Sequence, residues 1–316
     1  MLEHLEKAHA VLTEVNKAVL GKQTEIFEIM TAFLANGHVL LEDIPGVGKT
    51  TLAVAFSTAM GMECNRVQFT PDVMPSDLTG FSVYRRDKDK FVYQPGSVFC
   101  NLLLADEINR TSPKTQSALL EVMEERKVSV EGETRPVPSP FLVIATQNPS
   151  GTSGTQFLPE AQIDRFMINL SLGYPDPESE LEIARSTGAQ SRTSLVSPVL
   201  STDILLEMQN DIHNIFINDN VYKYIINLIS ATRNHPYIER GASPRATIAL
   251  VRMAKASAWL RGRKFVVPAD VQFQLPYVLS HRITANSSAK LGSIAKNDII
   301  KSVVQTVPLP YMGDKQ

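Results

Sequence analysis

The stretch that decides the fold runs from residue 38 to residue 50 and reads His-Val-Leu-Leu-Glu-Asp-Ile-Pro-Gly-Val-Gly-Lys-Thr. Its first half is an apolar run that predicts a buried strand, and the residues after it have the pattern of a helix. Glycines between the two let the backbone curl so that its N–H groups face a phosphate. The stretch therefore predicts a phosphate-binding P-loop, although Asp43 stands where the motif usually has its first glycine.

The residues of this loop have expected roles in binding a nucleotide. We expect Lys49 to contact the β- and γ-phosphates, and the hydroxyl of Thr50 to bind Mg²⁺. A chance glycine-rich turn is the alternative, but the strand before the loop and the helix after it favour a phosphate site. The predicted nucleotide-binding residues of the loop are Pro45, Gly46, Val47, Gly48, Lys49, Thr50 and Thr51.

Two carboxylates follow a second apolar run, residues 102–105. Open α/β sheets bind ligands at the carboxyl ends of their strands, so we expect Asp106 to hold Mg²⁺ and Glu107 to polarise the attacking water. Read alone, the pair could equally be the solvated end of a strand; the upstream P-loop favours catalysis. A further strand, residues 141–145, leads to Asn148, which could orient the water or the γ-phosphate, or be a turn residue before proline.

Short apolar runs separated by helical patterns predict an α/β fold: a P-loop NTPase core with a parallel five-stranded sheet flanked by helices. From about residue 191 only helical patterns appear, which predicts a small all-α lid domain. The expected domains are therefore residues 1–190 and 191–316. The expected strands are residues 38–41, 66–69, 102–105, 141–145 and 166–170.

Local signals mark several helices. Capping residues and prolines predict helix starts, and one set of apolar residues predicts the buried face of the first helix. The expected starts are at Asp176-Pro177, Ser201, Ser243-Pro244, Pro268 and Asn297, with a helix stop at Gly188. The expected buried face consists of Leu2, Leu5, His9, Leu12, Val15 and Val19.

Composition excludes several classes of protein. The chain of 316 residues has 31 Lys and Arg against 33 Asp and Glu, without the basic excess that is typical of nucleic-acid binders. Its two cysteines, Cys64 and Cys100, can supply neither a disulfide framework nor a structural zinc site. No apolar run is long enough for a membrane span, and the charged first residues do not resemble a secretory signal. We expect a cytoplasmic protein.

The order of these motifs resembles the AAA+ ATPases, and several segments resemble the MoxR family within that group. The resemblance covers nearly the whole chain, from about Val19 to Ile283. The segments that carry it are residues 38–43, Asp106-Glu-Ile-Asn-Arg, Ser112-Pro-Lys-Thr-Gln-Ser-Ala-Leu-Leu-Glu, Ala145-Thr-Gln-Asn-Pro and Leu158-Pro-Glu-Ala-Gln-Ile-Asp-Arg-Phe.

The resemblance implies roles by position. Asn148 matches the family's first sensor, and Arg165 its arginine finger, which acts on ATP bound by the neighbouring subunit. Arg245 matches the second sensor, supplied by the lid to the γ-phosphate of the same subunit. Gly21 lies in a stretch similar to the one that packs against adenine. Without the resemblance, Arg165 could equally form a structural salt bridge with Asp164 or another residue.

Two stretches are similar to insertions of this branch of the family. Residues 70–95 match an insert that interrupts the second core helix, and residues 127–138 predict a hairpin that turns at Glu131-Gly132. In related ring ATPases such elements face the pore or the client. The charged run at residues 85–90 could also be a solvated loop.

The resemblance implies a Mg²⁺-dependent ATPase that produces ADP and phosphate and remodels or matures a partner protein or complex. A ring, with a hexamer expected, follows if Arg165 acts in trans. The family's partners are often proteins with a von Willebrand factor A-type domain. One alternative is a nucleic-acid-directed motor, which the net charge of −2 disfavours. Another is an ATP-gated scaffold with little turnover, which the presence of Glu107, Asn148 and Arg165 disfavours.

Overall fold

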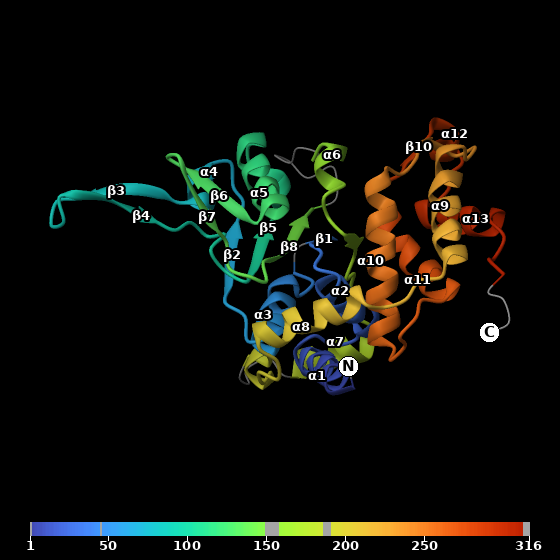
Figure 1. Ribbon diagram of the computed structural model, residues 1–316, viewed down its shortest axis with the longest axis horizontal. Helices are drawn as coiled ribbons and strands as arrows, with labels where there is room; N and C mark the ends of the chain where they lie inside the picture. Colours follow the sequence, from blue (N-terminus) through green and yellow to red (C-terminus); the bar gives the residue numbers. More distant parts are fainter. Residues whose placement is uncertain (1, 45, 149–157, 186–190, 312–316) are drawn as a thin grey trace.

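A five-stranded parallel sheet forms the centre of the first part of the chain (Figure 1). The computed structural model describes residues 2–44, 46–148, 158–185 and 191–311. The strand order is β2-β5-β8-β1-β9, and the predicted strands are confirmed to within two residues at either end. Their bounds are β1 Val39–Glu42, β2 Cys64–Gln68, β5 Leu102–Asp106, β8 Leu142–Gln147 and β9 Ile168–Leu170.

Alternating side chains of these strands pack against two sets of helices. On β1, Val39 and Leu41 join the apolar core that includes α1, α2 and α3, whereas Leu40 joins the core beneath α5. Because both faces of the sheet are covered, its central strands read as continuous apolar runs. The helices are α1 Leu2–Ala18, α2 Gln23–Leu34, α3 Lys49–Ala59 and α5 Pro113–Glu125.

The predicted buried face is confirmed at Val15 and, just after α1, at Val19, and differs at the other positions. Leu2 is 74% exposed, and the buried positions are Ala8, Val11, Val15 and Ala18. The prediction followed the large apolar side chains, but α1 packs closely against α3 through a stripe that includes two alanines. Small side chains allow the helices to approach, and this packing outweighs the pattern of leucines.

Two hairpins leave the core next to one another. β6 Lys127–Val130 and β7 Glu133–Pro136 form the predicted hairpin that turns at Glu131-Gly132. The stretch expected to interrupt a core helix instead connects β2 to β5 through α4 Pro75–Thr79 and a second hairpin. That hairpin, β3 Phe81–Arg85 and β4 Lys90–Gln94, projects far from the body (Figure 1). The hydroxyl of Ser82 donates a hydrogen bond to the carboxylate of Glu131 and links the two hairpins.

The second part of the chain is a helical lid with one small strand pair. Antiparallel strands β10 and β11 correct the prediction that only helices occur here, and α12 was not predicted. Two- and three-residue strands carry too little periodicity to be detected in a sequence. None of the described helices is long and apolar enough to cross a membrane. The bounds are α8 Thr202–His213, α9 Asp219–Arg233, β10 Ile238–Arg240, α10 Pro244–Leu260, α11 Pro268–Leu279, β11 Thr284–Ala285, α12 Ser287–Leu291 and α13 Lys296–Thr306.

Capping side chains begin helices where the sequence predicts. The Ser201 hydroxyl accepts a hydrogen bond from the backbone N–H of Ile204 at the start of α8. The Ser243 hydroxyl accepts one from Arg245 at the start of α10. Asp176 caps α7, and the predicted stop of that helix, Gly188, lies outside the described residues. The remaining short helices are α6 Glu160–Ile163, α7 Pro177–Arg185, η1 Ile108–Arg110 and η2 Arg192–Leu195.

A buried carboxylate fastens the end of β1 to the segment after β9. Asp43 is 3% exposed and accepts three hydrogen bonds: from the hydroxyl of Ser171 at 2.7 Å, the N–H of Leu172 at 2.6 Å and the N–H of Gly173 at 3.0 Å. Hydrogen bonds to a charged acceptor are stronger than those to a neutral one. Asp43, which stands where the P-loop motif usually has its first glycine, therefore holds the end of β1 and the segment after β9 together at the base of the loop.

We predict that Asp43→Asn lowers the free energy of unfolding by at least about 2 kcal/mol, because an amide offers one acceptor oxygen where three donors converge. Urea unfolding at neutral pH measures the change. Ser171→Ala removes a single donor and should cost about 1 kcal/mol. An Asp43→Asn variant as stable as the unchanged chain would show that the three hydrogen bonds do not stabilise the fold.

A buried glutamate lies where the core meets the lid. Glu28 on α2 is fully buried, and its Oε1 accepts a hydrogen bond from the side-chain amide of Gln274 on α11 at 3.3 Å. Glu28 Oε2 and Gln274 Oε1 lack hydrogen-bond partners among the described residues. Burial raises the pKa of Glu28 to about 8, although the bond from Gln274 and the charge of Arg261 lower it. A proton on Glu28 would supply the donor that the two oxygens lack.

We predict that stability falls as pH rises toward and through 8, and that Glu28→Gln removes this loss. The unfolded chain releases the proton near pH 4.5 and the folded chain at about 8, so the folded state binds more protons between these values. Denaturant unfolding from pH 5 to pH 9 tests this, with Glu6→Gln, an exposed position on α1, as control. Equal pH profiles for Glu28→Gln and the unchanged chain would contradict a proton at this position.

Candidate functional site

The P-loop has an open inner surface. Gly46 and Gly48 both have φ of +90°, a conformation that disfavours other residues. Apart from chain neighbours, no atom of the described residues lies within 4 Å of where a Cβ would stand at either position. α3 begins at Lys49, so its first backbone N–H groups have no partners within the helix and are available to an anion. The cradle fits a phosphate group. Pro45 lies outside the described residues.

The lysine of the loop is buried and ready to bind an anion. Lys49 is 7% exposed, and its ammonium donates to the carbonyl oxygens of Asp43 at 3.2 Å and Ile44 at 3.3 Å. Neutral carbonyls compensate a buried cation only in part, so a phosphate would be a better partner. Thr50 and Thr51 lie beside Lys49 in the first turn of α3, and Val47 packs against the apolar core.

Gly21 lies in the turn between α1 and α2, in close contact with the start of α7. It has φ of +67°, and a Cβ at this position would lie 2.4 Å from the Asp176 carboxylate and 2.5 Å from the Ser179 hydroxyl. A larger residue would have to adopt this φ and displace these two side chains. Gly21 therefore fixes the turn between α1 and α2 against α7; its predicted place beside adenine stays a prediction.

Asp106 is fixed at the carboxyl end of β5 by two neighbouring strands. Its Oδ1 accepts a hydrogen bond from the hydroxyl of Thr146 on β8 at 2.6 Å, and its Oδ2 pairs with the guanidinium of Arg66 on β2 at 2.8 Å. The Thr146 hydroxyl also accepts the backbone N–H of Glu107 at 2.9 Å. These contacts hold both acids at the edge where the P-loop lies. Sequence reasoning missed Arg66 and Thr146 because each lies within an ordinary strand pattern.

Glu107 adopts a left-handed backbone conformation with φ of +57°, which is uncommon for a residue other than glycine. Its Oε1 accepts the side-chain amide of Asn148 at 3.1 Å, and its Oε2 pairs with Arg110 at 2.7 Å. Burial raises the pKa of Glu107, but the hydrogen bonds from Arg110 and Asn148 outweigh it, so the net pKa is lowered. The carboxylate is therefore ionised at neutral pH.

The donor set at this edge suits Mg²⁺ with a nucleotide. Among the described residues no group of three or more His, Cys, Asp or Glu side chains could hold a metal ion. Mg²⁺ instead commonly binds one or two protein oxygens together with phosphates and waters. Thr50 and Asp106 can supply those oxygens. Asn148 Oδ1 and Asn109 Oδ1 are buried without a partner among the described residues, which leaves acceptors for water in the site.

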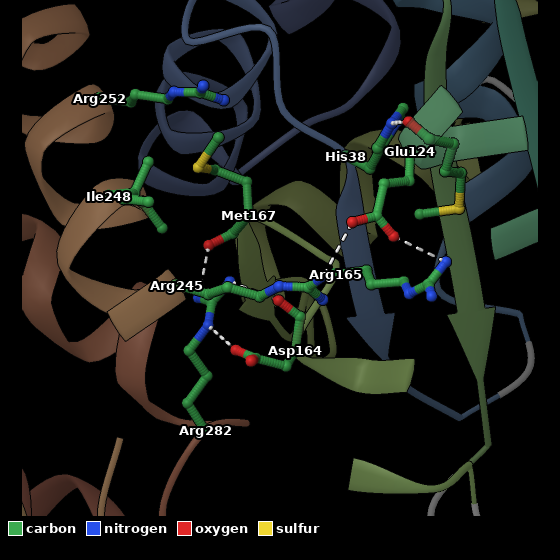
Figure 2. A pocket seen from close by; sticks show the side chains of 11 residues that line it. His38, Glu124, Asp164, Arg165, Met167, Arg245, Ile248, Arg252 and Arg282 are labelled. Carbon is green, nitrogen blue, oxygen red and sulfur yellow. Dashed lines mark hydrogen bonds and ion pairs between the residues drawn. The ribbon is translucent and has the colours of Figure 1, made fainter. Parts of the chain in front are cut away.

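The two arginines assigned to the nucleotide lie together at the opposite edge of the sheet. Arg165 pairs with the Glu124 carboxylate at 3.0 Å and donates to the carbonyl of Leu120 at 2.8 Å. Arg245 pairs with the other oxygen of Glu124 at 2.8 Å, as Figure 2 shows. Asp164 instead pairs with Arg282 at 2.7 Å, so the ion pair considered for Arg165 forms with a different carboxylate.

These groups line a cavity of about 170 Å³. It lies at the amino edge of the sheet, because His38 directly precedes β1 and Met167 directly precedes β9. The P-loop follows the carboxyl end of β1, a strand that spans about 13 Å. The structure therefore does not bring Arg245 to the P-loop of its own chain. The lining residues are His38, Met123, Glu124, Asp164, Arg165, Met167, Arg245, Ile248, Ala249, Arg252 and Arg282.

A buried histidine sets the position of this cavity. His38 Nδ1 accepts the N–H of Val143 at 3.1 Å, and its Nε2 donates to the carbonyl of Met123 at 3.1 Å. Burial holds the pKa of His38 well below its usual range, which agrees with a neutral ring. The ring fastens the last turn of α5 to the sheet and places Glu124 between the arginines. The sequence carried no signal for Glu124, because its partners are more than 40 residues away.

Comparisons with known proteins agree with this architecture. The family model "ATPase family associated with various cellular activities (AAA)" matches residues 38–168, and the AAA lid domain matches residues 230–303. Protein YeaC of Bacillus subtilis is 42% identical, over 94% of this chain and 92% of its own length. Chaperone MoxR1 of Mycobacterium tuberculosis is 41% identical, over 98% of this chain and 83% of its own length.

A solved structure of a protein from Cytophaga hutchinsonii is 40% identical, with a TM-score of 0.91 over 98% of this chain and 97% of that one. The likeness thus extends through core and lid alike, in sequence and in fold. On these grounds the chain belongs to the MoxR family of AAA+ ATPases.

Proposed function

We propose that the protein hydrolyses ATP to ADP and phosphate in the presence of Mg²⁺. The observation that carries this proposal is the group of Lys49, Asp106, Glu107 and Asn148 at one edge of the sheet, beside an open glycine loop. A nucleotide-gated scaffold would need the loop and lysine but not an ionised carboxylate held for proton transfer.

Each residue of this edge has a distinct task. Lys49 and the N–H groups at the start of α3 bind and orient the phosphates. Thr50 and Asp106 would hold Mg²⁺, which when bound neutralises charge on the phosphate oxygens. Glu107 takes a proton from the attacking water, so its lowered pKa keeps it in the accepting form at neutral pH. Asn148 orients the carboxylate and leaves its own Oδ1 free to accept from that water.

Arg165 and Arg245 would act on the nucleotide of a neighbouring copy. Both line one cavity at the edge opposite the P-loop, which favours contact with a nucleotide carried by another chain. An arginine at the developing phosphoryl charge stabilises the transition state. Contacts between two different edges of identical chains are heterologous and can close into a ring, for which we propose a hexamer. This assignment replaces the expectation that Arg245 serves its own chain.

The turnover would be coupled to remodelling or maturation of a partner protein. One relative is named a chaperone, and the two linked hairpins give this chain a projecting surface apart from the nucleotide edge. On β3 and β4, Phe81 is 48% exposed and Phe91 71% exposed, which offers apolar contact area to a client. A partner with a von Willebrand factor A-type domain, and a cytoplasmic location, are proposed from the family resemblance.

We predict that Glu107→Gln lowers the turnover of Mg²⁺·ATP by at least about 100-fold, because the amide cannot accept the proton. The affinity for ATP should change little, since Lys49 and the glycine loop are intact. Phosphate release and equilibrium nucleotide binding measure the two quantities. Lys49→Ala is the matched control that should lose binding itself. Unchanged turnover in Glu107→Gln would contradict the proposed base.

The same Glu107→Gln variant tests the nature of the partner. Held in its ATP-bound form in cells of the source organism, it should retain one protein or protein complex through affinity purification. Lys49→Ala should not, because it cannot reach that form. Recovery of nucleic acid in place of protein, with ATP turnover that DNA stimulates, would identify a nucleic-acid motor instead.

A further inference from the structure

The short segment that carries Arg165 is held on both sides by one residue of the lid. Arg282, in the turn after α11, donates to the carbonyl oxygens of Asp164 at 3.0 Å, Phe166 at 2.5 Å and Met167 at 3.0 Å. Its Nε also pairs with the carboxylate of Asp164 at 2.7 Å (Figure 2). These partners lie directly before and after Arg165, so Arg282 fixes the backbone from which the Arg165 side chain projects.

Every donor of this guanidinium is in use. The group has five N–H donors in a fixed plane, and the fifth bond goes to the carbonyl of Val278 on α11 at 2.7 Å. The Arg282 side chain is only 3% exposed. Although it lines the cavity, Arg282 therefore has no donor left for a phosphate, and its contacts join the lid to the core.

The same carboxylate continues the contact to the second arginine. The hydroxyl of Ser243 donates to Asp164 Oδ2 at 2.8 Å, while Arg282 takes Oδ1. Ser243 caps α10 and accepts the backbone N–H of Arg245 in the first turn of that helix. Asp164 thus connects the segment that carries Arg165 with the helix start that carries Arg245.

The contact that Arg165 and Arg245 make with Glu124 is of a different kind. The exposed fractions are 31% for the Arg165 side chain, 47% for Arg245 and 43% for Glu124. Ion pairs between exposed side chains contribute little to holding a structure. The buried contacts of Arg282 and Asp164, rather than Glu124, consequently set where the two arginines start.

We infer that Arg282 is a positioning residue: with Asp164 it holds Arg165 and Arg245 at a fixed spacing, ready for a nucleotide on the neighbouring copy. The inference rests on the proposed ATPase function and adds to it a residue that acts only through others. Groups that stabilise a transition state must be held in place before the reaction, and a displacement of about 1 Å can cost about 100-fold in rate.

The test measures kcat and the equilibrium affinity for ATP of the full chain with Arg282→Lys or Asp164→Asn. A lysine cannot serve five acceptors, and an asparagine keeps the shape of Asp164 without its charge. We expect each variant to lower kcat about 10- to 100-fold, with the affinity for ATP unchanged because the P-loop is intact. The control Arg263→Lys weakens another Arg–Asp pair of the lid, with Asp270 at 2.5 Å, outside the cavity lining, and should leave kcat unchanged.

Mixed variants separate positioning from a general structural fault. A copy with Arg282→Lys keeps its P-loop, and a copy with Lys49→Ala keeps its arginines in place. An equal mixture that exchanges subunits should therefore regain about a quarter of the unchanged turnover. A mixture of Arg282→Lys with Arg245→Ala should stay low, because both copies are defective at the same edge.

The outcomes distinguish this inference from the function on which it rests. If the unchanged chain hydrolyses ATP, Glu107→Gln abolishes hydrolysis and Arg282→Lys and Asp164→Asn retain full kcat, the positioning role is wrong and the ATPase stands. Low turnover of Arg282→Lys that Lys49→Ala does not restore also overturns the positioning role. If the unchanged chain does not hydrolyse ATP, both ideas fall. Thermal unfolding shows that each variant is folded, and Asp164→Asn gives the same readouts if Arg282→Lys does not fold.

Discussion

All strands of a parallel sheet run in the same direction, so their carboxyl ends and their amino ends form two chemically different edges. The rest of this site depends on that constraint. Every carboxyl end lies at one edge of the sheet and every amino end at the other, so residues that follow β1, β5 and β8 meet, as do residues that precede β1 and β9. The P-loop, the acidic pair and Asn148 occupy the first edge. Arg165 and Arg245 line the cavity at the second.

Buried polar contacts keep each edge in shape. Asp43, Thr146 and Arg66 fasten the carboxyl edge, and His38 fastens the end of α5 at the amino edge. At each edge a carboxylate is held by cations in the isolated chain: Glu107 by Arg110, and Glu124 by both arginines of the cavity.

Much of the fold could be predicted from the sequence, because its signals are local. The glycine loop, the apolar strand runs and the serine caps each act within a few residues of chain, and the structure has them where they were expected. The buried face of α1, the strands β10 and β11 and the course of residues 70–95 could not be predicted in this way. They depend on which helices approach closely and on partners distant in the sequence.

The residues of the candidate site also fall into two groups: those that the sequence predicts and those that only the structure reveals. Lys49, Asp106, Glu107 and Asn148 stand in recognisable motifs. The contacts of Arg66, Glu124 and Thr146 with these and other site residues are known only from the structure. Arg245 is the most instructive residue, since its type and helix position suggested contact with a phosphate, whereas the structure places it beside Arg165 on the carboxylate of Glu124.

The most direct test of a site divided between copies is to mix two inactive variants. Lys49→Ala lacks a working P-loop but keeps both arginines, and Arg245→Ala has the reverse defect. Mixed in equal amounts and allowed to exchange subunits, they should regain about a quarter of the unchanged turnover, because one interface in four pairs an intact loop with an intact neighbour. A mixture of Lys49→Ala with Glu107→Gln should stay inactive. If the Arg245→Ala mixture also stays inactive while Lys49→Ala with Arg165→Ala recovers, Arg245 serves its own chain and the account is contradicted.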